Sequence, residues 1–120
     1  MIKVLIVDDS KSIRDILQKI IETSKDMKVV AKASNPYEAV KLLKKYNPDV
    51  ITLDIEMPGM SGIDFLKRLM NARPTPVVMI SSLTQKGADA TIRALDLGAI
   101  DFVPKRRLNN KLDKKRFMRE

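Results

Sequence analysis

Short apolar runs alternate with longer segments of helical periodicity, and this alternation recurs five times along the chain. Most of the apolar runs are rich in β-branched residues and lack polar–apolar alternation, as is typical of strands buried on both faces. The pattern predicts an α/β fold with a single doubly wound, five-stranded parallel sheet covered by helices on both faces. The expected strands are residues 4–7, 29–31, 50–53, 77–80 and 100–103.

The segments between these strands carry signals for where each helix begins or ends. Ser12, with Asp15 three positions later, is expected to cap the first helix. The second helix is expected to take Asn35 as its N-cap and Pro36 as its first helical residue. Gly98 follows the fourth helical segment, at a position where a positive φ is favoured. A chain of 120 residues organised in this way is expected to form one domain.

Polar residues follow four of the five expected strands directly. In an open parallel sheet the ligand site lies beyond the carboxyl ends of the strands, so these residues are expected to meet at one edge. Each of the acids and serines is by itself also a common helix N-cap. Their recurrence at successive strand ends favours a shared site. The residues are Asp8 and Asp9 after the first strand, Asp54 after the third, Ser81 and Ser82 after the fourth, and Lys105 after the fifth.

Three carboxylates brought together repel one another, which favours a bound cation. The chain contains no His and no Cys, so only oxygen ligands are available, and these favour Mg²⁺. Lys105 and Ser81 would contact the oxygens of a phosphoryl group beside that ion. Asp54 stands alone at its strand end and is the candidate nucleophile. The residues therefore predict Mg²⁺-assisted phosphorylation of an aspartate.

Several other classes of function lack the residues that they need. Without His, a Ser-His-Asp triad is excluded, and without Cys there is neither a disulfide framework nor a thiolate zinc site. The chain has no glycine-rich phosphate loop and no dinucleotide-binding fingerprint. It also has no apolar run of membrane-spanning length and no signal-peptide pattern at its start, so we expect a cytoplasmic protein without a membrane partner.

With these features in place, the chain resembles the receiver domain of bacterial two-component response regulators. The likeness rests on residues 4–10, 53–62, 78–82 and 98–105, which share the family's motifs. It implies a flavodoxin-like fold with strand order 2-1-3-4-5 and five helices, and phosphorylation of Asp54 by a sensor histidine kinase. It also implies further roles, in which Asp8, Asp9 and the main-chain carbonyl of Glu56 hold Mg²⁺, Lys105 contacts the phosphoryl group, and Ser81 and Phe102 switch the face formed by the fourth helix, fifth strand and fifth helix.

A narrower likeness is to the regulatory half of chemotaxis protein-glutamate methylesterases of the CheB type. It rests on residues 54–58, 74–84, 90–95 and 98–103. The resemblance implies a chemotaxis kinase as the phosphoryl donor and a C-terminal esterase domain as a partner, although this chain ends at Glu120 and lacks the His of an esterase triad. A free-standing receiver remains the alternative. One departure from the family pattern is Arg106, which stands where a proline usually follows the active-site lysine.

The C-terminal segment differs from the rest of the chain in charge. Residues 105–120 carry eight basic side chains and two acids, and so hold most of the net charge of +8. We expect residues 1–105 to form the domain core and residues 106–120 to be a basic fifth helix or the start of a linker. The segment is too short for a helix-turn-helix, and Phe117 is its only aromatic residue, so a nucleic-acid partner is not expected.

A function of another class stays open at this point. The same residues suit a small Mg²⁺-dependent phosphohydrolase that forms an aspartyl phosphate. Rapid turnover would require a second acid or base near Asp54, and Glu56 is the candidate.

Overall fold

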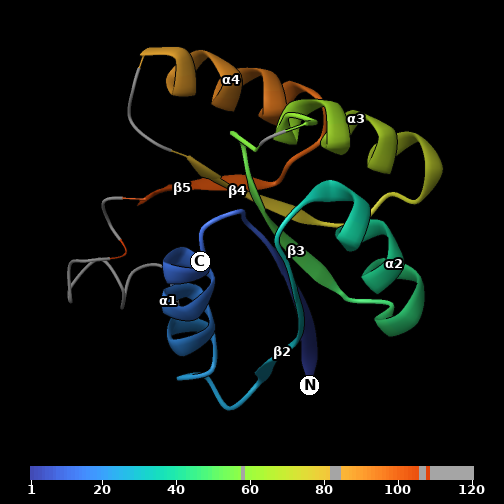
Figure 1. Ribbon diagram of the computed structural model, residues 1–120, viewed down its shortest axis with the longest axis vertical. Coiled ribbons are helices and arrows are strands. Elements are labelled where there is room, and N and C mark those ends of the chain that lie inside the picture. The colour runs from blue at the N-terminus through green and yellow to red at the C-terminus, as the bar shows by residue number, and fades with distance from the viewer. Residues whose placement is uncertain (58, 82–84, 106–107, 109–120) are drawn as a thin grey trace.

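The computed structural model describes residues 1–57, 59–81, 85–105 and 108 (Figure 1). Strands and helices alternate from the first element to the last, as the sequence predicts. The elements are β1 (Ile2–Val7), α1 (Lys11–Ile21), β2 (Met27–Ala33), α2 (Pro36–Tyr46), β3 (Val50–Asp54), α3 (Gly62–Ala72), β4 (Val77–Ser81), α4 (Gln85–Asp96) and β5 (Asp101–Pro104). The fifth helix expected after residue 105 falls on residues 106–120, of which only Leu108 lies within the described residues.

The strands form one parallel sheet in the order β2-β1-β3-β4-β5, which confirms the predicted fold class and strand order. The chain moves from β1 outward to β2 and then returns to β3 on the other side of β1. The direction of winding therefore reverses between β1 and β3, and ligands of open α/β sheets bind beyond the carboxyl ends of the strands at such a point.

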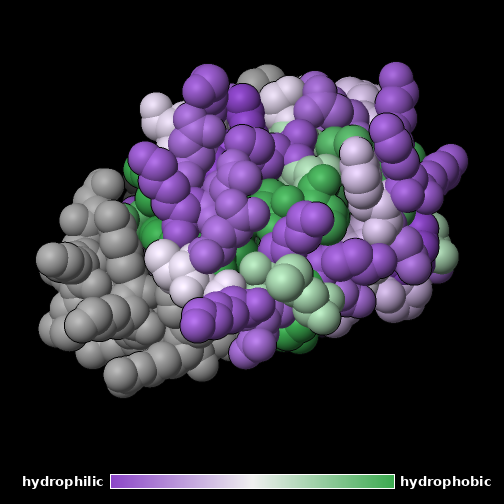
Figure 2. All heavy atoms as spheres, turned by 90° about the horizontal axis from the view of Figure 1, so that it is seen from below, coloured by the Kyte–Doolittle hydropathy of each residue, from purple (hydrophilic) through white to green (hydrophobic). Residues whose placement is uncertain are grey.

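Two apolar clusters hold the layers together. On one face of the sheet, α2, α3 and α4 pack against the strands through residues such as Leu43, Leu66 and Ala94 (Figure 1). On the other face, Leu17 and Ile20 of α1 pack against the sheet, and Leu108 joins them with 1% of its surface exposed. The polar faces of the helices point outward, and Figure 2 shows mostly hydrophilic residues around a smaller apolar area on the side viewed from below.

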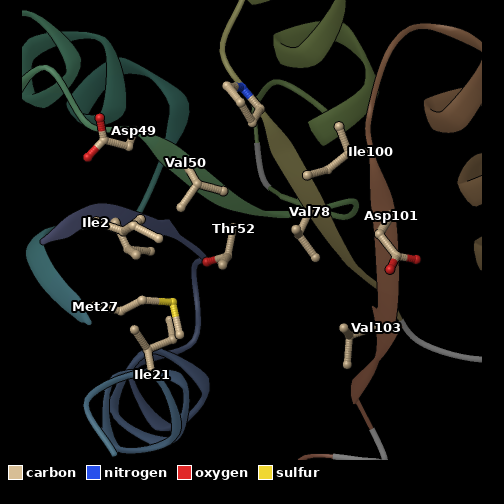
Figure 3. A pocket seen from close by; sticks show the side chains of 12 residues that line it. Ile2, Ile21, Met27, Asp49, Val50, Thr52, Val78, Ile100, Asp101 and Val103 are labelled. Atoms are coloured by element: carbon tan, nitrogen blue, oxygen red, sulfur yellow. The ribbon is translucent and has the colours of Figure 1, made fainter. Parts of the chain in front are cut away.

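The α1 side of the sheet is less completely filled by the described residues. A hollow of about 500 Å³ lies there, lined by side chains from α1 and from all five strands. Figure 3 shows Val50, Thr52, Val78 and Val103 projecting from β3, β4 and β5 into the same space as Met27. Leu108 belongs to the apolar cluster that borders this space, so the chain beyond β5 reaches the α1 side.

Helix ends follow the sequence signals except in the first helix. The α1 helix begins at Lys11 and its N-cap is Ser10, whose hydroxyl accepts a hydrogen bond from the N–H of Ile13, so the prediction of Ser12 as the cap is wrong. The reason is a turn immediately before the helix, in which the N–H of Ser10 donates to Asp8 Oδ1 at 2.9 Å. This turn places Ser10, two residues ahead of Ser12, in the capping position.

The other two signals are confirmed. Asn35 caps α2 by accepting a hydrogen bond from the N–H of Glu38 at 2.9 Å, and Pro36 occupies the first helical position. Gly98 follows α4 with a φ of +118°. Among the described residues, no helix combines the length and the apolar character needed to cross a membrane.

Candidate functional site

The carboxyl edge of the sheet gathers the side chains that the sequence singles out. Asp8 follows β1 directly, Asp54 ends β3, Ser81 ends β4 and Lys105 follows β5. Because β1, β3, β4 and β5 are successive neighbours in the sheet, these four residues lie along one edge. The fold thus assembles the predicted set from four separate parts of the chain. Ser82, the other predicted serine, lies outside the described residues.

Three carboxylates converge at this edge. Asp8, Asp9 and Asp54 each offer an oxygen, and these oxygens lie within 4.8 Å of one another. Asp8 and Asp54 are buried, with 0% and 1% of their surfaces exposed, whereas Asp9 is exposed to solvent. The arrangement is a small acidic pocket in which Asp9 is the solvent-exposed member.

Each buried carboxylate has a hydrogen-bond partner on only one of its two oxygens. Asp8 Oδ1 accepts a hydrogen bond from the Ser10 N–H, while Asp54 Oδ1 accepts one from the Glu56 N–H at 3.2 Å and faces Lys105 Nζ at 3.2 Å. The second oxygen of each, Oδ2, is buried without a hydrogen-bond partner in the described part of the protein. Buried carboxylate oxygens are costly unless something neutralises them, so the pocket suits a cation.

Burial and mutual repulsion make both carboxyl groups harder to ionise. Desolvation, followed by the charge of Asp8, raises the pKa of Asp54 to about 7, and Lys105 partly opposes this increase. The pKa of Asp8 is also raised, chiefly by its burial. In the protein alone, Asp54 is therefore partly protonated near neutral pH. A divalent cation among these oxygens would favour the ionised, nucleophilic form.

The structure also describes the positions of Ser81, Phe102 and Glu56. Ser81 is 2% exposed and pairs in the sheet with Pro104, one residue before Lys105. Phe102 is half-buried in β5 and pairs with Met79. Glu56 is exposed, and it contacts Asp54 through its main-chain N–H. The departure at Arg106 lies outside the described residues, so its effect on the loop after Lys105 stays a prediction.

Two residues that sequence reasoning missed support the site through main-chain contacts. At Gly62, a Cβ would lie 2.1 Å from the Asp54 carbonyl oxygen, so only glycine permits the start of α3 to approach β3 this closely. The Gly62 N–H donates to the Ile55 carbonyl at 2.7 Å, which fixes the loop between β3 and α3. Arg14 of α1 donates from Nη1 to the Asp8 carbonyl at 2.8 Å.

Comparison with known proteins points to the same kind of domain. Residues 4–116 match the family described as response regulator receiver domain. A curated protein-glutamate methylesterase/protein-glutamine glutaminase from Chromohalobacter salexigens is 62% identical over 104 residues, which cover 87% of this chain and 29% of the relative. The protein of the same name from Bordetella pertussis is 59% identical over 107 residues, covering 89% of this chain and 31% of the relative.

Solved structures agree with the sequence relatives. The response regulator domain of Thermotoga maritima CheB superposes with a TM-score of 0.83 at 46% identity, covering 99% of this chain and 89% of that one. The chemotaxis protein CheY4 of Vibrio cholerae gives a TM-score of 0.79 at 28% identity, covering 99% of this chain and 97% of that one. The chain thus spans about a third of the length of the curated relatives, but nearly all of the Thermotoga receiver structure.

Proposed function

Because the chain belongs to the response regulator receiver family, we propose that Asp54 is its phosphoacceptor, with a sensor histidine kinase as the phosphoryl donor. The observation that carries this proposal is the pair of buried carboxylates, Asp8 and Asp54, each with one unpaired oxygen, together with the Lys105 ammonium 3.2 Å from Asp54 Oδ1. A domain core without a functional site would not bring oxygens of two such groups within 4.8 Å of each other, since their burial costs free energy unless a ligand or a reaction uses them.

The acidic pocket is proposed to hold Mg²⁺. Its ligands would be the carboxylates of Asp8, Asp9 and Asp54 together with the main-chain carbonyl of Glu56. When bound, the ion supplies positive charge that offsets the carboxylates and the oxygens of an incoming phosphoryl group. The unpaired Oδ2 atoms of Asp8 and Asp54 support this assignment because each needs a positive partner.

The transfer step requires little more than positioning. An oxygen of Asp54 forms a bond to phosphorus while the bond from phosphorus to the imidazole nitrogen of the donor breaks, and that nitrogen keeps the electron pair. Lys105, already 3.2 Å from Asp54 Oδ1, is placed to contact an oxygen of the transferred group. Ser81 would donate a hydrogen bond to another of these oxygens from the end of β4.

Phosphorylation is proposed to change the surface of α4 and β5. Ser81 moves toward the new phosphoryl group, and Phe102 turns into the space that is vacated. Ile92 and Leu95 on α4 and Ile100 next to β5 leave large apolar side chains exposed, 62% of the surface in the case of Ile92. Such exposed apolar groups suit a surface that a second domain or partner covers.

For this chain we place that switch in a chemotaxis methylesterase pathway. The relatives that share about 60% identity are methylesterases roughly three times as long, which supports an esterase domain as the partner of the α4–β5 surface and a chemotaxis kinase as the donor. A cytoplasmic location would follow from this role. The phosphohydrolase alternative is less favoured, because Glu56 contacts Asp54 through its main-chain N–H and is exposed to solvent.

The C-terminal segment is proposed to complete the domain. Leu108 is already anchored in the apolar cluster on the α1 side, and the hollow beside it carries Asp49 and Asp101 among its lining residues. A basic fifth helix formed by residues 106–120 would cover this hollow and place cations near those acids. Truncation after Leu108 then lowers the stability of the protein, whereas a segment that serves only as a linker could be removed without such a loss.

The phosphoacceptor role is tested with acetyl phosphate, a small donor that requires no kinase. With Mg²⁺ present, mass spectrometry of the intact protein is expected to show one phosphoryl adduct, which peptide mapping assigns to Asp54. The adduct should disappear in Asp54→Asn and persist in Asp26→Asn, a matched change of an exposed acid. An adduct that survives in Asp54→Asn, or that forms equally well in a chelator, would overturn the proposal.

A further inference from the structure

A second hollow is lined by residues of α2 and α3, the two helices on the right of Figure 1, and it shares no residue with the acidic pocket. Its volume is about 400 Å³, enough for two or three side chains the size of leucine. The floor is apolar and is contributed by both helices and by the loop before α3. The residues that form it are Tyr37, Val40, Leu43, Met60, Phe65 and Leu69.

The apolar floor is partly open to solvent. Tyr37 keeps 64% of its surface exposed and Val40 keeps 43%, whereas Leu43, Phe65 and Leu69 are buried beneath them. Single exposed apolar side chains are ordinary on a protein surface. Here, however, they border a concave apolar groove, which is the form that a docking site for apolar side chains takes.

The rim of the groove carries positive charge from both helices. Lys44 of α2, Arg68 of α3 and Arg73 at the end of α3 line it, and no acid is among the described lining residues. Arg73 is held in place, because its guanidinium donates to the Leu43 carbonyl at 3.3 Å and to the side chain of Asn47. One of the three cations is therefore pre-positioned, while Lys44 and Arg68 are exposed.

The acids in the first turns of the two helices do not line the groove. Glu38 is in the first turn of α2 and Asp64 is in the first turn of α3, whereas Lys44 and Arg73 lie at the helix ends. Both helices follow strands of a parallel sheet and so run in the same direction. The cations that line the groove therefore lie in the C-terminal half of α2 and in the C-terminal half and cap of α3.

We propose that this groove binds an acidic amphipathic peptide segment of a protein partner. Two or three apolar side chains of the segment would enter between Val40 and Leu69, and its carboxylates would face Lys44, Arg68 and Arg73. A nucleic acid fits less well, because its phosphates would use the cations but leave the apolar floor exposed. The inference does not depend on phosphorylation, since none of these residues belongs to the acidic pocket.

The probe is a fluorescein-labelled synthetic helix of 15 residues with leucine at positions i, i+3, i+4 and i+7 and mostly glutamate elsewhere. Fluorescence anisotropy at low salt is expected to show saturable binding to the full chain, weakened by added salt. A probe with lysine in place of each glutamate, and another with serine in place of each leucine, should each bind at least roughly tenfold more weakly.

Protein variants locate the binding site. Arg68→Glu and Val40→Ser are expected to weaken binding by roughly tenfold each. Lys67→Glu is the matched charge control, because Lys67 is an exposed neighbour on α3 that does not line the groove. Ile92→Ser is the apolar control on α4, where the side chain is more exposed, at 62% of its surface against 43% for Val40. Both controls should change the affinity less than about twofold.

Three results of the binding measurements would overturn the proposal. They are an absence of saturable binding, an equal loss of affinity in Lys67→Glu and Arg68→Glu, and a loss in Ile92→Ser instead of Val40→Ser. Sedimentation showing that Arg68 and Val40 hold a second copy of the chain would also overturn it. Acetyl phosphate labelling of the same variants separates this inference from the phosphoacceptor proposal, because Arg68→Glu should leave the Asp54 adduct unchanged.

Discussion

Among the described residues, two regions bury side-chain oxygens without hydrogen-bond partners, and the surroundings of those oxygens differ. At the carboxyl edge, the Oδ2 atoms of Asp8 and Asp54 belong to charged groups that converge with Asp9 and Lys105. In the hollow on the α1 side, the hydroxyl of Thr52 is unpaired among valine, isoleucine and methionine side chains (Figure 3). Only the first region combines unpaired atoms with converging charge.

This difference indicates under which conditions a buried polar atom without a hydrogen-bond partner is evidence of function. A lone hydroxyl such as that of Thr52 costs about 1 to 3 kcal/mol when buried without a partner, and a stable domain tolerates that. Two carboxylates in contact cost more, and their repulsion is relieved by protonation or by a cation. The carboxyl edge is therefore interpreted as a site, and Thr52 as a packing imperfection. The following experiments test that contrast.

The largest expected effect comes from the close approach that holds the site together. Gly62→Ala would place a Cβ 2.1 Å from the Asp54 carbonyl oxygen, so the main chain must shift, with a loss of about 4 kcal/mol in the free energy of unfolding. Urea denaturation measures this loss. Gly59→Ala is the matched control, because Gly59 has a φ of +85° but open space around it, and should lose only about 1 kcal/mol. Equal losses of stability in the two variants would mean that the contact between the start of α3 and the end of β3 is not close.

The next effect concerns the ionisation of Asp54 when a chelator keeps divalent cations out of the site. Because its folded pKa is raised to about 7 from 3.8, the folded protein holds a proton that the unfolded chain releases between these values, and stability falls as pH rises from 4 to 7. Asp54→Asn removes the cost of burying this ionised carboxylate and should stabilise the protein at pH 8 by roughly 2 kcal/mol. Denaturation at pH 5 and pH 8 provides the measurement. A variant that is no more stable than the parent at pH 8 would contradict the buried, repelled carboxylate.

A smaller effect is expected from the cation itself. Mg²⁺ at ten times its dissociation constant should stabilise the folded protein by about 1.4 kcal/mol, since it binds the folded state alone. Thermal melts with and without the ion measure this gain, which should vanish in Asp8→Asn. The Thr52→Val variant is the control for the other region and should keep the gain in full. A gain that persists in Asp8→Asn would place the cation elsewhere.

The sequence predicts some features of the fold and the site by itself, whereas other features require the family resemblance or the structure. The periodicity of the sequence predicts the strands and helices, because a buried strand can be identified from its own apolar run without knowledge of its neighbours. The positions of the strand ends then predict that Asp8, Asp54, Ser81 and Lys105 lie at one edge of the sheet. Strand order came from family resemblance, since nothing in the periodicity of β2 says that it pairs outside β1.

Contacts with the main chain of remote residues could not be anticipated. Gly62 is one glycine among four, and its need for a missing Cβ exists only once α3 lies against Asp54. Arg14 contacts a carbonyl six residues away, and no residue type at that position encodes the contact. Ser10 and Ser12 are chemically equivalent caps, and the turn formed by the Asp8 side chain decides between them. In each case a three-dimensional contact selects among residues that look alike in the sequence.

The smallest predicted effect tests the interpretation of Thr52 directly. Thr52→Val keeps the side-chain shape but removes the unpaired hydroxyl, so it should stabilise the protein by about 1 kcal/mol. Thr75→Val is the matched control, because the buried Thr75 hydroxyl donates to the Arg73 carbonyl at 3.0 Å, and its loss should cost about 1 kcal/mol. Urea denaturation compares the two variants, and acetyl phosphate labelling should be unchanged in Thr52→Val. If Thr52→Val instead destabilised the protein or blocked labelling, the hydroxyl would have a partner or a role, and the contrast between the two regions would fail.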